Sequence, residues 1–213
     1  MCVEIRTYES ERYGMRALVP IANGSEDIEV VAIADVLARG DIEVVLATVE
    51  PSLLVQLMKG IRIQASCELM AVADEAFDAI VVPGGVPGSF HLGQSETLRK
   101  MLVAHHRAGA VVAAVCLAPA LVLEPAGVLA KSDRATCNPL QISTPTETFA
   151  PDHFTSMLGE KFDGAVRVCV DEPHRIVTSQ APGTTIEFAL AVVNMLRGPK
   201  VASEIAAYLK IHD

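Results

Sequence analysis

The chain has 213 residues, of which 51% are hydrophobic, and its 26 acidic side chains outnumber 17 Lys and Arg for a net charge of -9. This length suits one α/β domain with a substantial core, and not two domains of ordinary size. An acidic chain is repelled by a phosphate backbone, which argues against nucleic acid as a partner. No apolar run approaches the ~20 residues that cross a bilayer, so we expect no membrane association.

The start of the chain is charged and has no apolar stretch of the kind that a secretory signal requires. We therefore interpret residues 1–14 as a short N-terminal extension and residues 15–213 as one domain, and we expect a cytoplasmic protein. The 5 cysteines include no CxxC pair and cannot all pair within one chain, which indicates free thiols in a reducing compartment. We expect neither a metal nor a cofactor.

Short β-branched runs alternate with helical patterns along the first half of the chain. Strands are predicted over 17–21, 42–49, 79–82 and 110–115, with helices over 26–39 and 96–107. Between the second and third strands, two apolar alternations flank Lys59-Gly60, which predicts a hairpin over 53–66. Strands that are apolar throughout and separated by helices predict a mostly parallel sheet covered on both faces.

The second half is less regular. Residues 136–164 carry three prolines with several Ser and Thr, and we interpret them as an irregular excursion over the surface. Two strands over 166–170 and 175–178, a helix over 184–197 and a last helix over 200–210 complete the predicted domain.

The sharpest local feature is a buried strand that passes into a helical pattern at one cysteine, in Val111-Val112-Ala113-Ala114-Val115-Cys116-Leu117-Ala118-Pro119. Such an elbow presents the cysteine at the carboxyl edge of the sheet, near helix N–H groups that favour thiolate over thiol. The alternative is that Cys116 is a small buried hydrophobic residue, as free cysteines often are.

A second loop, Val82-Pro83-Gly84-Gly85, leaves the preceding strand at the same edge. Its bare glycine backbone allows a substrate to approach closely. The N–H groups of Gly85 and Leu117 could then form an oxyanion hole. A glycine turn alone is weak evidence, and its pairing with the cysteine elbow carries the hypothesis.

The first helix begins at Asn23-Gly24-Ser25-Glu26-Asp27, where Asn23 or Ser25 is expected to cap and the two acids suit the positive helix end. Glu29 follows on a helix that is apolar nearly all round, so we expect it to be buried. Burial would favour a protonated Glu29 that donates a hydrogen bond to a nearby thiolate. The alternative is a carboxylate that reaches water near the helix start.

Together these elements resemble the DJ-1/PfpI (ThiJ) superfamily, most closely its DJ-1/YajL branch, from about residue 16 to residue 210. Two further segments carry the resemblance, namely Thr178-Ser179-Gln180-Ala181-Pro182-Gly183-Thr184 and Glu187-Phe188-Ala189-Leu190-Ala191. The resemblance implies a flavodoxin-like three-layer α/β/α sandwich, a homodimer, and a Glu29 hydrogen bond to a Cys116 thiolate that oxidants convert to a sulfinate.

The resemblance also implies a function. Members act on small dicarbonyls without a cofactor: a glyoxalase activity converts methylglyoxal to lactate, a protein or nucleotide deglycase activity is disputed, and some protect against oxidative stress. Cys116 would be the nucleophile, Glu29 would move protons, and the backbone of Gly84, Gly85 and Leu117 would bind the oxyanion. The main alternative is a redox sensor or chaperone with little catalysis. A thiamine-precursor role or a cysteine peptidase ranks lower.

Several positions depart from family patterns or have auxiliary roles. Leu117 follows the cysteine where peptidase members have histidine, which argues against a Cys-His centre. Asn138 stands where the DJ-1 branch has a pocket histidine, so weaker turnover is expected, and His153 is a remote substitute. Lys59 matches a basic residue that reaches the partner's site across the dimer, although a solvated lysine fits as well. Glu26 and Pro182 complete the expected surroundings of the site.

Overall fold

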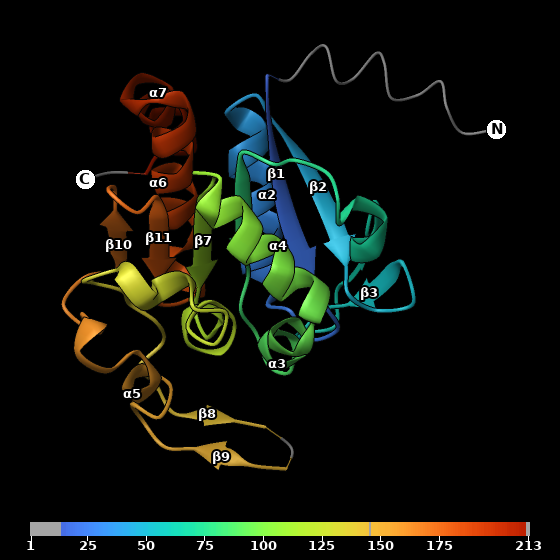
Figure 1. Cartoon of the computed structure of the whole chain (residues 1–213), viewed down its shortest axis with the longest axis vertical. Helices are drawn as coiled ribbons and strands as arrows, with labels where there is room; N and C mark the ends of the chain where they lie inside the picture. The colour runs from blue at the N-terminus through green and yellow to red at the C-terminus, as the bar shows by residue number, and fades with distance from the viewer. Residues whose placement is uncertain (1–13, 145, 212–213) are drawn as a thin grey trace.

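The computed structural model describes residues 14–144 and 146–211, and the expected N-terminal extension lies outside them apart from Gly14. Its central sheet has seven strands in the order β10-β11-β7-β6-β1-β2-β5 (Figure 1). Every neighbouring pair is parallel except β10 with β11. The strands of this sheet are β1 (Met15–Ile21), β2 (Ile42–Thr48), β5 (Cys67–Glu68), β6 (Ala79–Val82), β7 (Val111–Val115), β10 (Val168–Asp171) and β11 (Ile176–Ser179).

Helices cover both faces of this sheet, which gives the three-layer α/β/α sandwich predicted from the sequence. Helices α2 (Asp27–Arg39), α6 (Thr185–Arg197) and α7 (Pro199–Leu209) lie on one face. The other face carries α3 (Gly88–Gln94) and α4 (Glu96–Arg107), with the 3-10 turns η1 (Leu69–Val72) and η3 (Val128–Lys131) beside α4. Strands β6 and β7 are buried along their whole length, as their continuous apolar runs predict.

The predicted hairpin forms from β3 (Leu54–Gln56) and β4 (Arg62–Gln64), which pair antiparallel in a sheet of their own. It is fixed to the start of α2, because the carboxylate of Asp27 accepts hydrogen bonds from the N–H groups of Lys59 and Ile61 at 2.7 and 3.2 Å. Asp27 therefore holds the turn of the hairpin in place. The sequence had indicated only that its charge suits the positive end of the helix.

The start of α2 corrects one expectation. Glu26 is the N-cap, since its Oε2 accepts a hydrogen bond from Glu29 N at 2.8 Å. Ser25 Oγ instead accepts from Ala22 N, and Asn23 Oδ1 accepts from Gln56 N in the hairpin. The tight turn at Gly24 diverts both expected caps, and a glutamate takes their place.

The excursion over 136–164 is more ordered than predicted. It contains a small hairpin of β8 (Ile142–Ser143) and β9 (Thr148–Phe149), then the short helix α5 (Thr155–Leu158) and the 3-10 turn η4 (Gly159–Lys161). Helix α3 was also missed, because its sequence directly follows a glycine loop and has no apolar period. No helix within 14–144 and 146–211 combines the length and the apolar character that crossing a membrane requires.

Candidate active site

Cys116 lies at the carboxyl end of β7, in the elbow that the sequence predicts. Its φ of 63° is positive, a region that costs a non-glycine residue conformational free energy and is often found at functional sites. Two backbone hydrogen bonds hold this geometry: Cys116 N donates to Ser179 O at 3.0 Å, and Asn138 N donates to Cys116 O at 2.9 Å. The side chain is buried, with 5% of the residue exposed.

The segment after Cys116 differs from the expected helix. It forms the five-residue π-helical turn η2 (Pro119–Leu123), too short to build the dipole of a full helix. Burial raises the pKa of the Cys116 thiol, and the negative charge of Glu29 raises it further. Both effects oppose the preference for thiolate that the sequence indicated at a helix end.

Glu29 comes from the first turn of α2 and is completely buried. Its Oε2 accepts a hydrogen bond from Gly84 N at 2.6 Å, whereas Oε1 has no hydrogen-bond partner among the described residues. Burial is the main cause that raises the pKa of Glu29 to about 8, and the negative charge of Glu26 also raises it. The hydrogen bond from Gly84 and the contact with Cys116 lower this pKa in part. At neutral pH the carboxyl group holds a proton in contact with the thiol.

The glycine loop after β6 brings backbone against both side chains. A Cβ on Gly84 would lie 2.6 Å from the Cβ of Cys116 and 3.0 Å from Glu29 Oε2, so no larger residue fits. Gly85 has a φ of 100°, and a Cβ there would lie 2.4 Å from Glu26 N. The backbone of this loop is thus packed directly against the side chains of Cys116 and Glu29.

Three donors converge on the sulfur of Cys116. The backbone N–H groups of Gly85 and Leu117 are close enough to act on its pKa, and Asn138 Nδ2 donates a hydrogen bond to Sγ at 3.5 Å. All three lower the pKa of the thiol and so oppose the effect of burial. The two N–H groups expected to bind an oxyanion therefore lie beside the reacting atom, and their role in binding an oxyanion stays a prediction.

The comparisons with known proteins identify the family of this chain. The model of the DJ-1/PfpI family matches residues 15–195. The chain belongs to the DJ-1/PfpI family. Protein DJ-1 homolog A of Arabidopsis thaliana is 37% identical over 90% of this chain but only 45% of its own length, so this chain spans about half of that relative. A protein named glutathione-independent glyoxalase DJR-1.2, of Caenorhabditis elegans, is 33% identical over 85% of this chain and 88% of its own.

Solved structures show the same family. The chain titled oxidized DJ-1 of Toxoplasma gondii superposes with a TM-score of 0.82 at 36% identity, over 92% of this chain and 97% of that one. In this DJ-1/PfpI chain the elbow, the glycine loop and the buried acid lie at the carboxyl edge, near the neighbouring strands β1 and β6. The chain leaves β1 toward β2 and leaves β6 toward β7, in opposite directions along the sheet, and such a point is the usual ligand crevice of these folds.

The auxiliary residues lie at different distances from this centre. Glu26 is buried and caps α2. Pro182 begins the 3-10 turn η5 (Pro182–Thr184) after β11, and its role at the site stays a prediction. Lys59 is exposed at the hairpin tip, and its reach toward a partner stays a prediction. His153 is exposed and stacks on Phe149, with ring centroids 5.0 Å apart.

Sequence reasoning missed one wall of the surroundings. A cavity of about 730 Å³ lies between α3 and the β8-β9 hairpin, and its lining includes Val86, Pro87, Phe90 and Phe149. Val86 and Pro87 directly follow Gly85, which connects this cavity to the glycine loop. The sequence signal for this wall was weak, because Phe90 and Phe149 lie far apart in the chain and come together only in the fold. Among the described residues, no group of three or more His, Cys, Asp or Glu is placed to hold a metal ion.

Proposed function

We propose that this protein converts small reactive dicarbonyls, with methylglyoxal as the model substrate, to hydroxy acids without a cofactor. The observation that carries the proposal is the buried Glu29 carboxyl in contact with the Cys116 thiol, beside donors already directed at the sulfur. The relative named as a glutathione-independent glyoxalase supports the same chemistry. Cytoplasmic protection against carbonyl and oxidative stress, and deglycase action on modified proteins or nucleotides, are wider forms of this proposal.

The proposed reaction balances without an oxidant. The sulfur of Cys116 adds to the aldehyde carbon, and the thiol proton passes through Glu29 to the former carbonyl oxygen, giving a hemithioacetal. Glu29 then carries the proton from that carbon to the adjacent one through an enediol, giving a thioester of lactate. Water hydrolyses the thioester and restores the thiol. The N–H groups of Gly85 and Leu117 stabilise negative charge on the substrate oxygen.

The test is methylglyoxal consumption with enantiomer-resolved lactate detection in the absence of glutathione. We expect Cys116→Ala to lower kcat/KM by about a thousandfold or more, because the covalent step is lost. Cys137→Ala is the matched control: Cys137 is also a buried free thiol, and burial raises its pKa to about 12 without an acid partner. The proposal would be overturned if the wild type, Cys116→Ala and Cys137→Ala were all folded and equally inactive.

A redox sensor is the second candidate, and the unpartnered Glu29 Oε1 favours it. Two molecules of hydrogen peroxide would oxidise the thiol to a sulfinic acid and release two molecules of water. A sulfinate oxygen would then accept the Glu29 proton. Peptide mass analysis after peroxide treatment should find two added oxygen atoms on Cys116 before any on Cys67, and the reverse order would exclude the sensor.

We also propose a homodimer through the start of α2 and the β3-β4 hairpin. Large apolar side chains are exposed there, with Ile28 at 58%, Val31 at 49% and Ile61 at 54%. Sedimentation should give twice the 22.6 kDa chain mass. Val31→Glu should shift the protein to monomer, whereas Val170→Glu on edge strand β10 should not. A wild-type monomer at all concentrations would contradict the proposal.

A further inference from the structure

A second cavity, of about 660 Å³, lies at the opposite edge of the sheet from Cys116. It is bounded by the C-terminal end of α4, the turn η3 and the loop between β10 and β11. Its walls include the apolar side chains of Val103, Val128 and Pro173. Nothing in the proposed carbonyl chemistry uses this cavity.

The charge of this cavity is opposite to that of the chain. Five basic side chains line it, namely His106, Arg107, Lys131, His174 and Arg175. No Asp or Glu is among the described residues of its lining. Asp171 contacts His174 from behind the lining, which leaves Arg107 and Lys131 as cations without a matched anion, an arrangement that is expected where a negatively charged ligand binds. The protein as a whole carries a net charge of -9, so the cluster is not a consequence of composition.

The two histidines are held in place by the protein. His106 Nε2 lies 3.0 Å from His174 O, and His174 Nδ1 lies 2.9 Å from Asp171 Oδ1. Asp171 is itself fixed by Ser132 Oγ, which donates to its Oδ2 at 2.5 Å. Among the described residues, the second nitrogen of each ring has no hydrogen-bond partner. These rings are therefore oriented by one nitrogen and can offer the other to a ligand.

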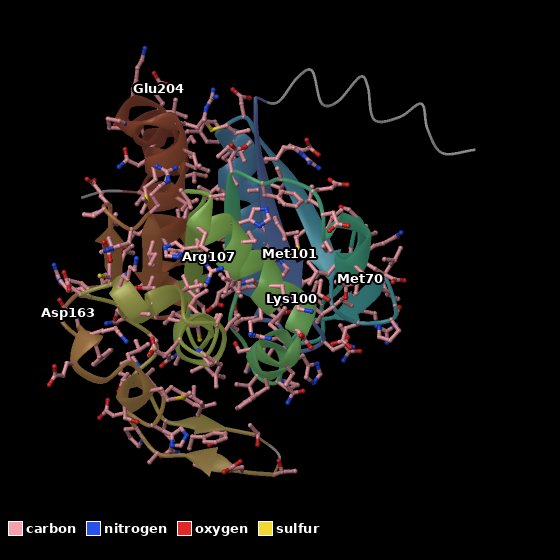
Figure 2. All side chains as sticks on the ribbon, in the orientation of Figure 1. Met70, Lys100, Met101, Arg107, Asp163 and Glu204 are labelled. Atoms are coloured by element: carbon pink, nitrogen blue, oxygen red, sulfur yellow. The ribbon has the colours of Figure 1, made fainter. Side chains whose placement is uncertain are left out.

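The two long cations are unpaired. Neither Arg107 nor Lys131 forms an ion pair with any described residue, in contrast to Lys100 on the same helix as Arg107, whose Nζ lies 3.0 Å from Glu96 Oε1. Figure 2 shows Lys100 and Arg107 at separate positions along α4. Both unpaired residues are exposed at the cavity mouth, where they can turn toward an incoming anion.

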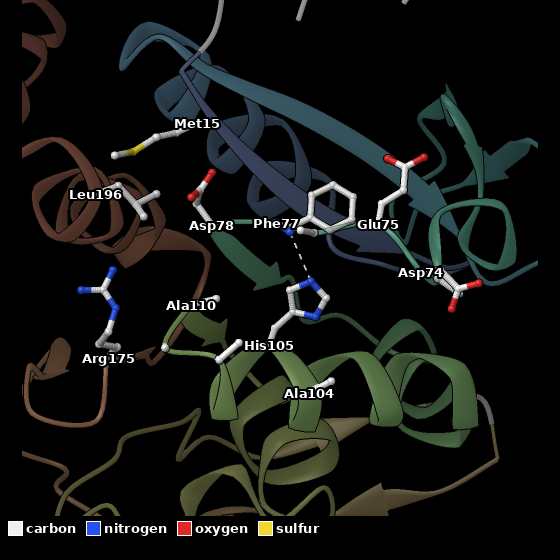
Figure 3. Close-up of a pocket in the computed structure, with 14 residues that line it drawn as sticks. Met15, Asp74, Glu75, Phe77, Asp78, Ala104, His105, Ala110, Arg175 and Leu196 are labelled. Carbon is white, nitrogen blue, oxygen red and sulfur yellow. Dashed lines mark hydrogen bonds between the residues drawn. The ribbon is translucent and has the colours of Figure 1, made fainter.

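Arg175 forms the wall toward a neighbouring cavity of about 480 Å³. Figure 3 shows its guanidinium directed toward the side of Leu196, and Asp78 lines the same cavity. That cavity also contains Asp74 and Glu75, so an anion is disfavoured there. Arg175 Nε is buried and has no hydrogen-bond partner among the described residues. Because the cavity of about 480 Å³ is lined by acids, an anion is expected to bind only in the basic cavity on the other side of Arg175.

We propose that the basic cavity binds a small organic phosphate. Two unpaired cations, Arg107 and Lys131, with two histidine rings around the same space favour a ligand with more than one negative charge, which distinguishes a phosphate monoester from a monocarboxylate. The apolar walls and the volume leave room for a carbon skeleton beside the phosphoryl group. The site is separate from Cys116, so occupancy does not require turnover.

Isothermal titration of the full chain with glycerol 3-phosphate tests this proposal, with inorganic phosphate, glycerol and acetate as comparison probes. We expect saturable binding of glycerol 3-phosphate, weaker binding of phosphate, and none of glycerol or acetate. Arg107→Ala with Lys131→Ala should weaken binding by about tenfold or more. Both side chains are exposed, so the double variant should fold, and its thermal unfolding would check this.

Lys100→Ala is the matched control, because it removes a cation from α4 outside the cavity. It should change the dissociation constant by less than about twofold. The proposal is overturned if glycerol 3-phosphate does not bind, if acetate binds as tightly, or if the double variant binds like the wild type. An equal loss in Lys100→Ala would also overturn it, because the effect would then reflect overall charge.

Discussion

Charged side chains at the two ends of the central sheet differ in how completely they are partnered. At the amino edge, the guanidinium of Arg16 lies 3.1 Å from Glu43 and 2.9 Å from Glu75, so its charge is matched twice. At the carboxyl edge, Glu29 is fully buried with one oxygen unpartnered, next to a cysteine in a strained conformation. The first arrangement stabilises the fold, and the second costs stability.

Asp171 sharpens this contrast. Burial alone would raise the pKa of Asp171, but hydrogen bonds from Ser132 and His174 outweigh it and lower the pKa. Glu29 has a single backbone donor, and burial raises its pKa to about 8. A carboxyl group kept protonated against a thiol is poorly suited to holding a fold together and well suited to moving a proton.

Filling the space at Gly84 should lower both stability and activity. Gly84→Ala places a methyl group 2.6 Å from the Cβ of Cys116, so the loop must move. We expect a loss of about 2 kcal/mol in the free energy of unfolding and roughly a hundredfold in kcat/KM. Gly183→Ala is the control, since a Cβ there meets nothing within 4 Å. Similar losses in both variants would contradict the close packing of the site.

Removing the buried acid should raise stability. The unfolded Glu29 carboxyl ionises near 4.5 and the folded one near 8, so between these pH values only the folded state keeps the proton. The protonated Glu29 therefore contributes its full share to the free energy of unfolding below pH 4.5, and this share is lost as the pH rises to about 8. Glu29→Gln should therefore be more stable than wild type by roughly 2–4 kcal/mol at pH 8 and similar to it near pH 4.5. Urea unfolding at both pH values measures this, and a pH-independent difference would count against it.

Asn138 should have a moderate effect on activity. Its Nδ2 donates to the Cys116 sulfur, while its Oδ1 accepts from Leu140 N at 2.8 Å. Asn138→Asp keeps the acceptor, removes the donor and adds negative charge beside the thiol. We expect kcat/KM to fall by about tenfold in Asn138→Ala and further in Asn138→Asp. If Asn138→Asp were the more active variant, the amide would serve the loop and not the sulfur.

At the amino edge the expected change is smallest. Asp171→Asn should cost about 1 kcal/mol of unfolding free energy at pH 7, because two hydrogen bonds lose their charged acceptor. Because the pKa of Asp171 is lowered in the folded state, its ionised form stabilises the protein above pH 3.8, and this stability is lost as the pH falls through the pKa of the folded state. The unfolding free energies of the variant and the wild type should therefore converge in acid. Glu172→Gln, on an exposed neighbour, is the control. Activity should be unchanged in both variants.

The sequence was sufficient for the regular parts of this molecule. Strand β6 and helix α4 have the predicted bounds, because buried β-branched runs and an amphipathic period are local signals. The burial of Glu29 was also predictable, since it lies on a helix that is apolar nearly all round.

Other features depended on contacts between distant segments. The hydrogen bond between Asn138 and Cys116, and that between Gly84 and Glu29, join residues that are distant in the sequence and that no local pattern relates. The N-cap was mispredicted because Asn23 and Ser25 bond elsewhere, and α3 has no apolar period to reveal it. Burial, which sequence patterns describe only coarsely, decides the pKa values of Glu29 and Cys116.

The most direct test of the Cys116–Glu29 pair is the pH dependence of kcat/KM for methylglyoxal in the wild type and Glu29→Gln. Below about pH 8 both groups hold protons, and the pair becomes reactive when the first proton leaves. The wild-type kcat/KM should therefore rise with pH and level off above about 8, while Glu29→Gln stays low with no inflection there. An unchanged inflection in Glu29→Gln would show that another group titrates, and would contradict the pair as the source of activity.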